Sequence, residues 1–213
     1  MKKILLFAVL AMIGCVNSPD QSPIYLSAEI KEGNSWRYIY EYFQTMQTTI
    51  YSDISIDSIW GSSLDTLFFT VTRIDSILQK RSTDDSLLDS SIVVTPDILC
   101  KKAGIKTICS DDLISSIFSD KEYIQYNDGK GNYGNLINIQ FGDRNFKTVD
   151  VASIKIIGAS KSEENHFLFA DTIGIICDTI AQGGHGIMPY IASTNLLKFN
   201  GRDFSYTTTL SPE

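Results

Sequence analysis

Aromatic side chains alternate strictly with other residues near the start of the chain. Trp36, Tyr38, Tyr40 and Tyr42 fall at every second position of a segment that we interpret as one strand over residues 35–51. A period of two is typical of a β-strand, because successive side chains point to opposite faces of a sheet. One face of this strand is therefore almost wholly aromatic. We expect that face to pack in the core; the alternative is a binding surface that stacks on sugars, apolar ligands or partner chains.

Strand-like alternation recurs along the rest of the chain. Short strands are predicted at 122–126, 135–141, 146–157 and 167–177. Residues 65–79 and 87–95 alternate on either side of a Ser- and Asp-rich interruption at 82–86, which predicts a hairpin. A second hairpin is predicted around Asn200-Gly201, because both residue types tolerate a positive φ.

One segment has the pattern of a helix. Ser110, Asp111 and Asp112 supply a capping side chain and first-turn acids ahead of apolar residues at helical spacing up to Phe118. The fold class we expect is mainly β: a curved antiparallel sheet or half-open barrel with one short helix, the alternative being a two-sheet β-sandwich. With 213 residues, 43% of them hydrophobic and 11% aromatic, the chain can bury the core of a single domain, which we assign to residues 28–213.

The N-terminus has the pattern of an export leader. Two lysines precede ten apolar residues, Ile4–Ile13, a run shorter than the roughly 20 residues that span a bilayer. A glycine and Cys15 then end the run and resemble a bacterial lipobox. The resemblance implies cleavage before Cys15, a diacylglyceryl group on its thiol and an acylated amino terminus; the alternative is an ordinary signal peptide with an incidental cysteine. We therefore expect a lipoprotein signal peptide at 1–14 and a lipidated tether at 15–27.

Two segments resemble a broad group of uncharacterised lipoproteins of Gram-negative bacteria. Glu32–Tyr38 is similar to their early G-N-x-W-x-Y strand, and Phe169–Ile175 to a late G-x-G-L-V strand, although Thr172 stands where that motif has its first glycine. The resemblance implies a curved antiparallel β domain on the periplasmic or surface side of the cell envelope, held by acylated Cys15. Val16 is not the Asp linked with inner-membrane retention, which by analogy favours the outer membrane. No mechanism is implied.

Cys100 and Cys109 have the spacing of a disulfide across a hairpin. With Gly104-Ile105 as a two-residue type II′ turn, Cys100 and Cys109 form a non-hydrogen-bonded pair whose Cα atoms lie about 4.5 Å apart. That separation suits a disulfide, and an exported protein meets an oxidising compartment. We expect this disulfide; the alternative is two reduced cysteines. Cys177 lies in an apolar run and is expected to be a small buried hydrophobe.

Charge and motifs narrow the functional classes. A net charge of −7 without a basic stripe argues against nucleic-acid binding and against electrostatic docking on anionic lipid. His166 and His185 lack metal-ligand spacing, and residues 127–135 fail the spacing of a calcium loop. The sequence has no nucleophile elbow and no phosphate loop. We therefore expect no metal and no cofactor.

Three functional hypotheses remain. We favour a non-catalytic, lipid-anchored envelope domain with a binding or structural role, whose membrane contact is made through acylated Cys15. The first alternative is a carrier that holds an apolar ligand in a half-barrel. The second is an envelope hydrolase whose site is assembled from distant residues. A deep apolar cavity would favour the carrier, and a cleft with converging carboxylates or a His–acid pair would favour the hydrolase.

Overall fold

The computed structural model describes residues 24–43, 46–63, 66–81, 86–123, 126–127, 129–130, 133–156, 161–184 and 187–209. Among these residues one helix, α2 (Asp112–Phe118), lies among many strands. The strands are β1 (Ile24–Leu26), β2 (Ser35–Phe43), β3 (Met46–Ser63), β4 (Thr66–Arg81), β5 (Leu87–Ala103), β6 (Lys106–Cys109), β7 (Lys121–Tyr123), β8 (Tyr126–Asn127), β9 (Tyr133–Phe141), β10 (Arg144–Ile156), β11 (Lys161–Ala170), β12 (Gly174–Gly184), β13 (Ile187–Phe199), β14 (Arg202–Asp203) and β15 (Thr207–Thr209). The described residues include no helix long and apolar enough to cross a bilayer.

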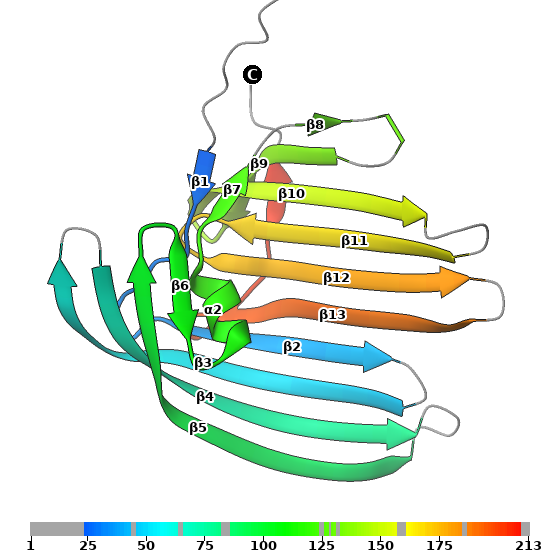
Figure 1. Cartoon of the computed structure of the whole chain (residues 1–213), viewed down its shortest axis with the longest axis horizontal. Coiled ribbons are helices and arrows are strands. Elements are labelled where there is room, and N and C mark those ends of the chain that lie inside the picture. The colour runs from blue at the N-terminus through cyan, green and yellow to red at the C-terminus, as the bar shows by residue number, and fades with distance from the viewer. Residues whose placement is uncertain are drawn as a thin grey trace, which may run out of the picture.

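Thirteen strands form one curved antiparallel sheet that does not close into a barrel (Figure 1). Their order is β15-β9-β10-β11-β12-β13-β2-β3-β4-β5-β6, with β14 on β13 and β8 on β9. β2 therefore lies between β13 and β3 and joins the two halves of the sheet. β1 and β7 pair in a separate two-stranded sheet. The expected fold class, a curved mainly β domain with one short helix, is confirmed.

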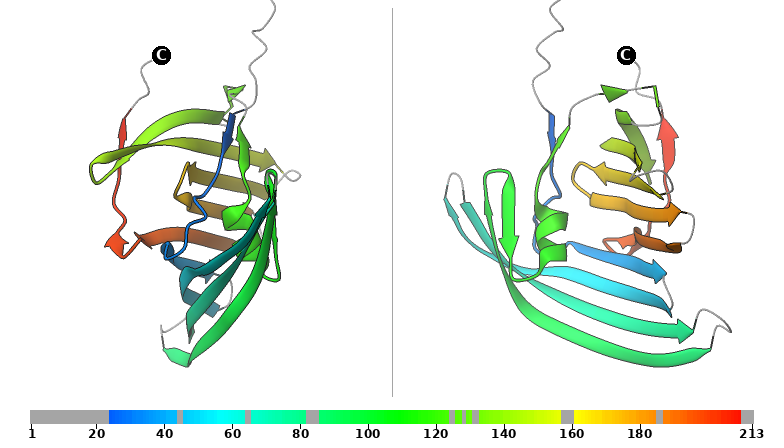
Figure 2. Two further views of the ribbon diagram at one scale, coloured as in Figure 1. Left: turned by 90° about the vertical axis from the view of Figure 1, so that its left-hand side faces the viewer. Right: turned by 45° about the vertical axis from the view of Figure 1, so that its right-hand side comes forward.

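The sheet has an inner face, which we define as the face that carries Trp36. α2, β1 and β7 lie over one half of this face and leave the other half open (Figure 2). Under this cover Trp36 packs edge-on against Phe118 of α2, at 5.2 Å between ring centroids, and Phe118 packs in the same way against Phe69 of β4. The main core thus lies at one end of the long strands.

Two predicted strands are each two strands in the structure. The segment 35–51 divides into β2 and β3, which begins at Met46, and the two pair with Ile39 opposite Tyr51. The segment 167–177 spans the end of β11 and the start of β12. Between them Thr172 takes a φ of 74°, and its backbone N–H donates to the carbonyl of Ser27. Contact with the N-terminal segment therefore fixes this turn.

The ordered body begins before the expected end of the tether. Ile24–Leu26 forms β1, and Leu26 is only 1% exposed. The described residues therefore begin with a strand that lies inside the segment expected to be the tether. The leader and Cys15 lie outside the described residues.

Both hairpins for which a turn was predicted have the expected geometry. Cys100 pairs with Cys109 around a turn in which Gly104 has a φ of 57°. The two sulfur atoms are bonded, and the Cα atoms lie 4.2 Å apart. At the other hairpin, Asn200 and Gly201 both have positive φ, at 49° and 74°, between β13 and β14.

Candidate functional site

The aromatic row of β2 runs from the core into the open half of the inner face. Trp36 and Tyr38 are buried, and their polar atoms donate to the carbonyls of Ile173, at 2.6 Å, and Ile175, at 3.0 Å. Tyr40 is half-buried, and Tyr42 is 40% exposed. The two expected roles of this face thus divide along one strand: the first two residues are core, and the last reaches solvent.

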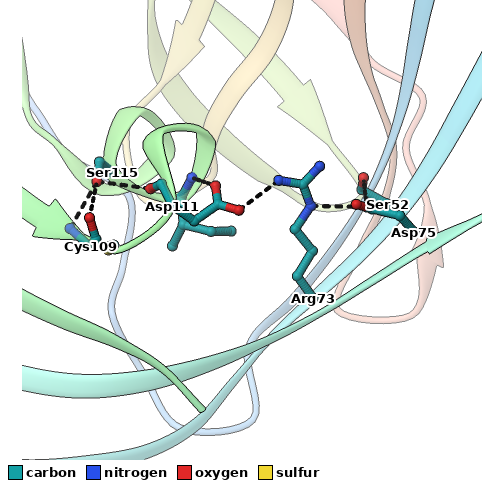
Figure 3. A network of polar contacts seen from close by, with 7 residues as sticks. Ser52, Arg73, Asp75, Cys109, Asp111 and Ser115 are labelled. Carbon is teal, nitrogen blue, oxygen red and sulfur yellow. Dashed lines mark hydrogen bonds and ion pairs between the residues drawn. The ribbon is translucent and has the colours of Figure 1, made fainter. Parts of the chain in front are cut away.

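A partly buried ionic network joins β4 to the start of α2 (Figure 3). Arg73 on β4 donates from Nε to Asp75 Oδ1, at 2.9 Å, and from Nη1 to Asp111 Oδ2, at 2.8 Å. Ser52 on β3 donates to the same Asp75 oxygen. Burial alone would lower the pKa of Arg73, but the two carboxylates outweigh it and raise the pKa. Arg73 therefore stays charged and links the sheet to the start of the helix.

The carboxylate of Asp111 also caps α2. Asp111 Oδ1 accepts a hydrogen bond from the backbone N–H of Ile114, at 3.0 Å, as an N-cap side chain does. Ser115 Oγ accepts from the backbone N–H of Cys109, at 2.8 Å, and donates to the carbonyl of Asp111. The helix, the disulfide hairpin and the sheet are thereby joined at one point.

Tyr40 stands next to this network. Its hydroxyl is buried and makes no hydrogen bond within the described part of the chain. Burial raises the pKa of the phenol; the charge of Arg73 lowers it, and those of Asp75 and Asp111 raise it again. The hydroxyl is therefore a neutral, unpaired donor at the edge of the open half.

Beyond Tyr40 the open half contains a shallow hollow of about 250 Å³. Its lining includes Tyr40, Tyr42, Ile50, Asp178, Ile180 and Ala192. These residues come from β2, β3, β12 and β13, which adjoin in the sheet. Glu41, Thr48, Ser193 and Thr194 complete the lining, so Asp178 and Glu41 are its two charged residues. The hollow is smaller than the roughly 300–1,000 Å³ of pockets that enclose a whole small molecule, so it fits one ring or a short apolar chain.

Lys121 on β7, in the covering layer, interacts electrostatically with Asp178. Its ammonium group lies over the rings of Phe167, at 5.6 Å, and Phe169, at 6.0 Å from the centroids. Burial lowers the pKa of Lys121, an effect that Asp178 opposes. Burial likewise raises the pKa of Asp178, and Lys121 opposes that shift. The two groups thus form a weakly solvated pair of opposite charges beside the hollow.

The outer face contains a His–acid pair. His166 Nε2 lies 3.0 Å from Asp150 Oδ1. The register places Cys177 on the same face, because Leu168 pairs with both Asp150 and Cys177. Burial raises the pKa of the Cys177 thiol, which therefore remains protonated and is a poor nucleophile. This face is opposite the hollow, so the pair does not complete a catalytic site there.

The remaining sequence candidates contribute little to the site. His185 lies outside the described residues. Asn127 Oδ1 accepts from the backbone N–H of Gly129, at 2.9 Å, as in a tight turn. Among the described residues no group of three His, Cys, Asp or Glu side chains could hold a metal ion.

Sequence reasoning missed Arg73, Asp75, Lys121 and Asp178. The first two could have been found, because they continue the alternation of Phe69 and Val71 onto the inner face. Asp178 and Lys121 carry no such pattern. In comparisons with known proteins, no family model, no curated protein and no solved structure matches this chain.

Proposed function

We propose that this chain is a lipid-anchored, non-catalytic domain of the cell envelope, and that the open half of its inner face binds an apolar or aromatic group of a larger partner. One observation carries the proposal: the aromatic row of β2 continues past the core into an open, mainly apolar hollow. Tyr42 and Ile180 leave apolar surface in contact with water. Covering that surface would stabilise the protein, so its exposure is better explained by binding than by a purely structural role.

The size of the hollow favours this function over a carrier. At about 250 Å³ it cannot enclose an acyl chain and its headgroup together. It can accept a single side chain or ring, for which Tyr42 offers a stacking surface and Asp178 a hydrogen-bond acceptor. The thiol of Cys177 is protonated, and the His–acid pair lies on the opposite face of the sheet from the hollow, so neither supports the hydrolase alternative.

A fluorescent apolar probe tests the hollow. The chain from residue 16 onward keeps every described residue and is titrated with 1-anilinonaphthalene-8-sulfonate. Ile180→Asp places a negative charge in the hollow, which repels the sulfonate of the probe, and is expected to weaken probe binding about tenfold, the equivalent of 1.4 kcal/mol. The matched control is Ile191→Asp, since Ile191 is 43% exposed, Ile180 is 37% exposed, and Ile191 lies on the opposite face of the neighbouring strand.

A second pair of variants separates the two faces of β2. Tyr42→Ala is expected to weaken binding of the probe, whereas Phe43→Ala is not, although the two side chains are 40% and 38% exposed. Equal binding by all four variants would exclude the hollow as the site.

The anchor has its own test. Mass spectrometry of the protein purified from membranes is expected to find an amino terminus at Cys15 with acyl groups on the thiol and the amine. An unmodified Cys15, or retention of residues 1–14, would contradict the anchored part of the proposal and leave the hollow to be judged by its variants.

A further inference from the structure

An exposed apolar row crosses the outer face of the covered end of the sheet. Trp60, Phe68, Lys101 and Ile108 pair in sequence across β3, β4, β5 and β6. Trp60 is 41% exposed and Ile108 69% exposed. The ammonium group of Lys101 lies 5.8 Å from the Phe68 ring centroid. We call these four residues the outer row; such contiguous apolar surface on a soluble domain normally marks a contact site.

The hairpin that carries half of the outer row is held firmly. The Cys100–Cys109 disulfide closes it, and Lys102 forms an ion pair with Asp120. The backbone N–H of Asp120 also donates to the carbonyl of Ile105 in the turn, at 2.9 Å. Ile105 itself is 46% exposed. The hairpin therefore presents its apolar side chains at a fixed position instead of folding them inward.

The turn of this hairpin lies at the same end of the molecule as the start of the body. In every view the β5–β6 turn and the start of β1 lie toward that end (Figures 1 and 2). Eight residues, 16–23, join Cys15 to Ile24. Fully extended they reach about 30 Å, so an acylated Cys15 would hold this end of the domain close to the bilayer.

We infer that the outer row and the turn of the β5–β6 hairpin contact the interface of the membrane to which Cys15 anchors the domain. The inference rests on the proposed lipid anchor. Tryptophan favours the boundary between lipid headgroups and acyl chains, and lysine can extend its ammonium group to the headgroups from an apolar stem. The contact is mainly apolar, so the acidic charge of the domain does not oppose it as it would oppose a purely electrostatic attachment.

Tryptophan fluorescence tests the contact. The chain has two tryptophans, and Trp36 is only 2% exposed in the core, so Trp60 is the residue that lipid can reach. The mature acylated protein is reconstituted into phosphatidylcholine vesicles with plain or brominated acyl chains. Brominated lipid is expected to quench the emission, and Trp60→Phe is expected to abolish that quenching while the protein still sediments with the vesicles.

A matched pair of substitutions identifies the surface. Ile108→Asp is expected to lose most of the quenching, and Ile92→Asp to keep it, because Ile92 is equally exposed, at 72%, but lies near the start of β5, far from the turn. Sedimentation without quenching, or equal quenching in the two variants, would overturn the contact and leave the anchor standing. Failure to sediment would overturn the anchor and the contact together.

Discussion

Arg73 is the single residue on which the junction of helix and sheet most depends. Its side chain is 17% exposed, between carboxylates that are 13% and 22% exposed. Arg73→Met removes the cation and leaves both carboxylates in a poorly solvated place. We expect a loss of about 3 kcal/mol in the free energy of unfolding, as when one partner of a buried ion pair is deleted.

The control is a more exposed ion pair that joins β2 and β3. Arg37 and Asp53 are 39% and 47% exposed, and Arg37→Met should cost less than about 1 kcal/mol. Urea unfolding of both variants makes the comparison. Similar losses in the two would show that the network of Arg73 is no more than a surface interaction.

Asp178 should make the stability of the folded protein depend on pH. Its pKa in the folded state is raised by burial, so the folded protein holds this proton more tightly than the unfolded chain. Protonated Asp178 therefore contributes its full stabilisation of the folded state below the ordinary Asp pKa. This contribution is lost as the pH rises through the pKa of Asp178 in the folded state. Asp178→Asn is expected to be more stable than the parent at neutral pH and to lose that advantage in acid. Unfolding measured across this range checks it; an unchanged or lower stability at neutral pH would contradict the assignment.

Among the elements, the β5–β6 hairpin owes its stability to its disulfide. Closing so short a loop restricts the unfolded chain by about 2.5 kcal/mol, so Cys100→Ala with Cys109→Ala should lower the free energy of unfolding by roughly that amount. A reductant should destabilise the parent in the same way and leave the double variant unchanged. Cys177→Ala provides the comparison. Cys177 forms no disulfide, so this variant should respond to reductant as the parent does.

Elements that end in a recognisable turn were predictable from sequence, and the others were not. Gly104 and Asn200-Gly201 supply the positive φ that their turns need, so these hairpins could be placed to the residue. No glycine, proline, asparagine or aspartate separates β2 from β3, and the alternation simply continues across the boundary. Thr172 adopts a positive φ that β-branched residues rarely take, under the control of hydrogen bonds from a segment 145 positions away.

At the scale of the whole molecule, the hollow could not have been predicted. Its lining comes from β2, β3, β12 and β13, and β2 meets β13 only because the sheet order brings the two ends of the chain together. Local periodicity correctly identified the aromatic face of β2, but it could not predict how much of that face other elements would cover. That limit is set by α2 and β7, whose docking on the inner face depends on Arg73 and on packing between distant segments.

The covered half of the inner face should be locally more stable than the open half. Phe69 and Leu78 each lie three residues from an end of β4, so fraying affects their amides equally. Phe69 is buried against Phe118 of α2, whereas Leu78 adjoins Ile77, which pairs with Ile50 of the hollow. Local opening costs less where a strand has few buried neighbours. Amide exchange at Phe69 is expected to be at least about tenfold slower than at Leu78, a difference of 1.4 kcal/mol, as read by hydrogen–deuterium exchange. Equal rates would mean that the open half needs no occupant to be as stable as the core, and would remove the physical reason for a binding partner there.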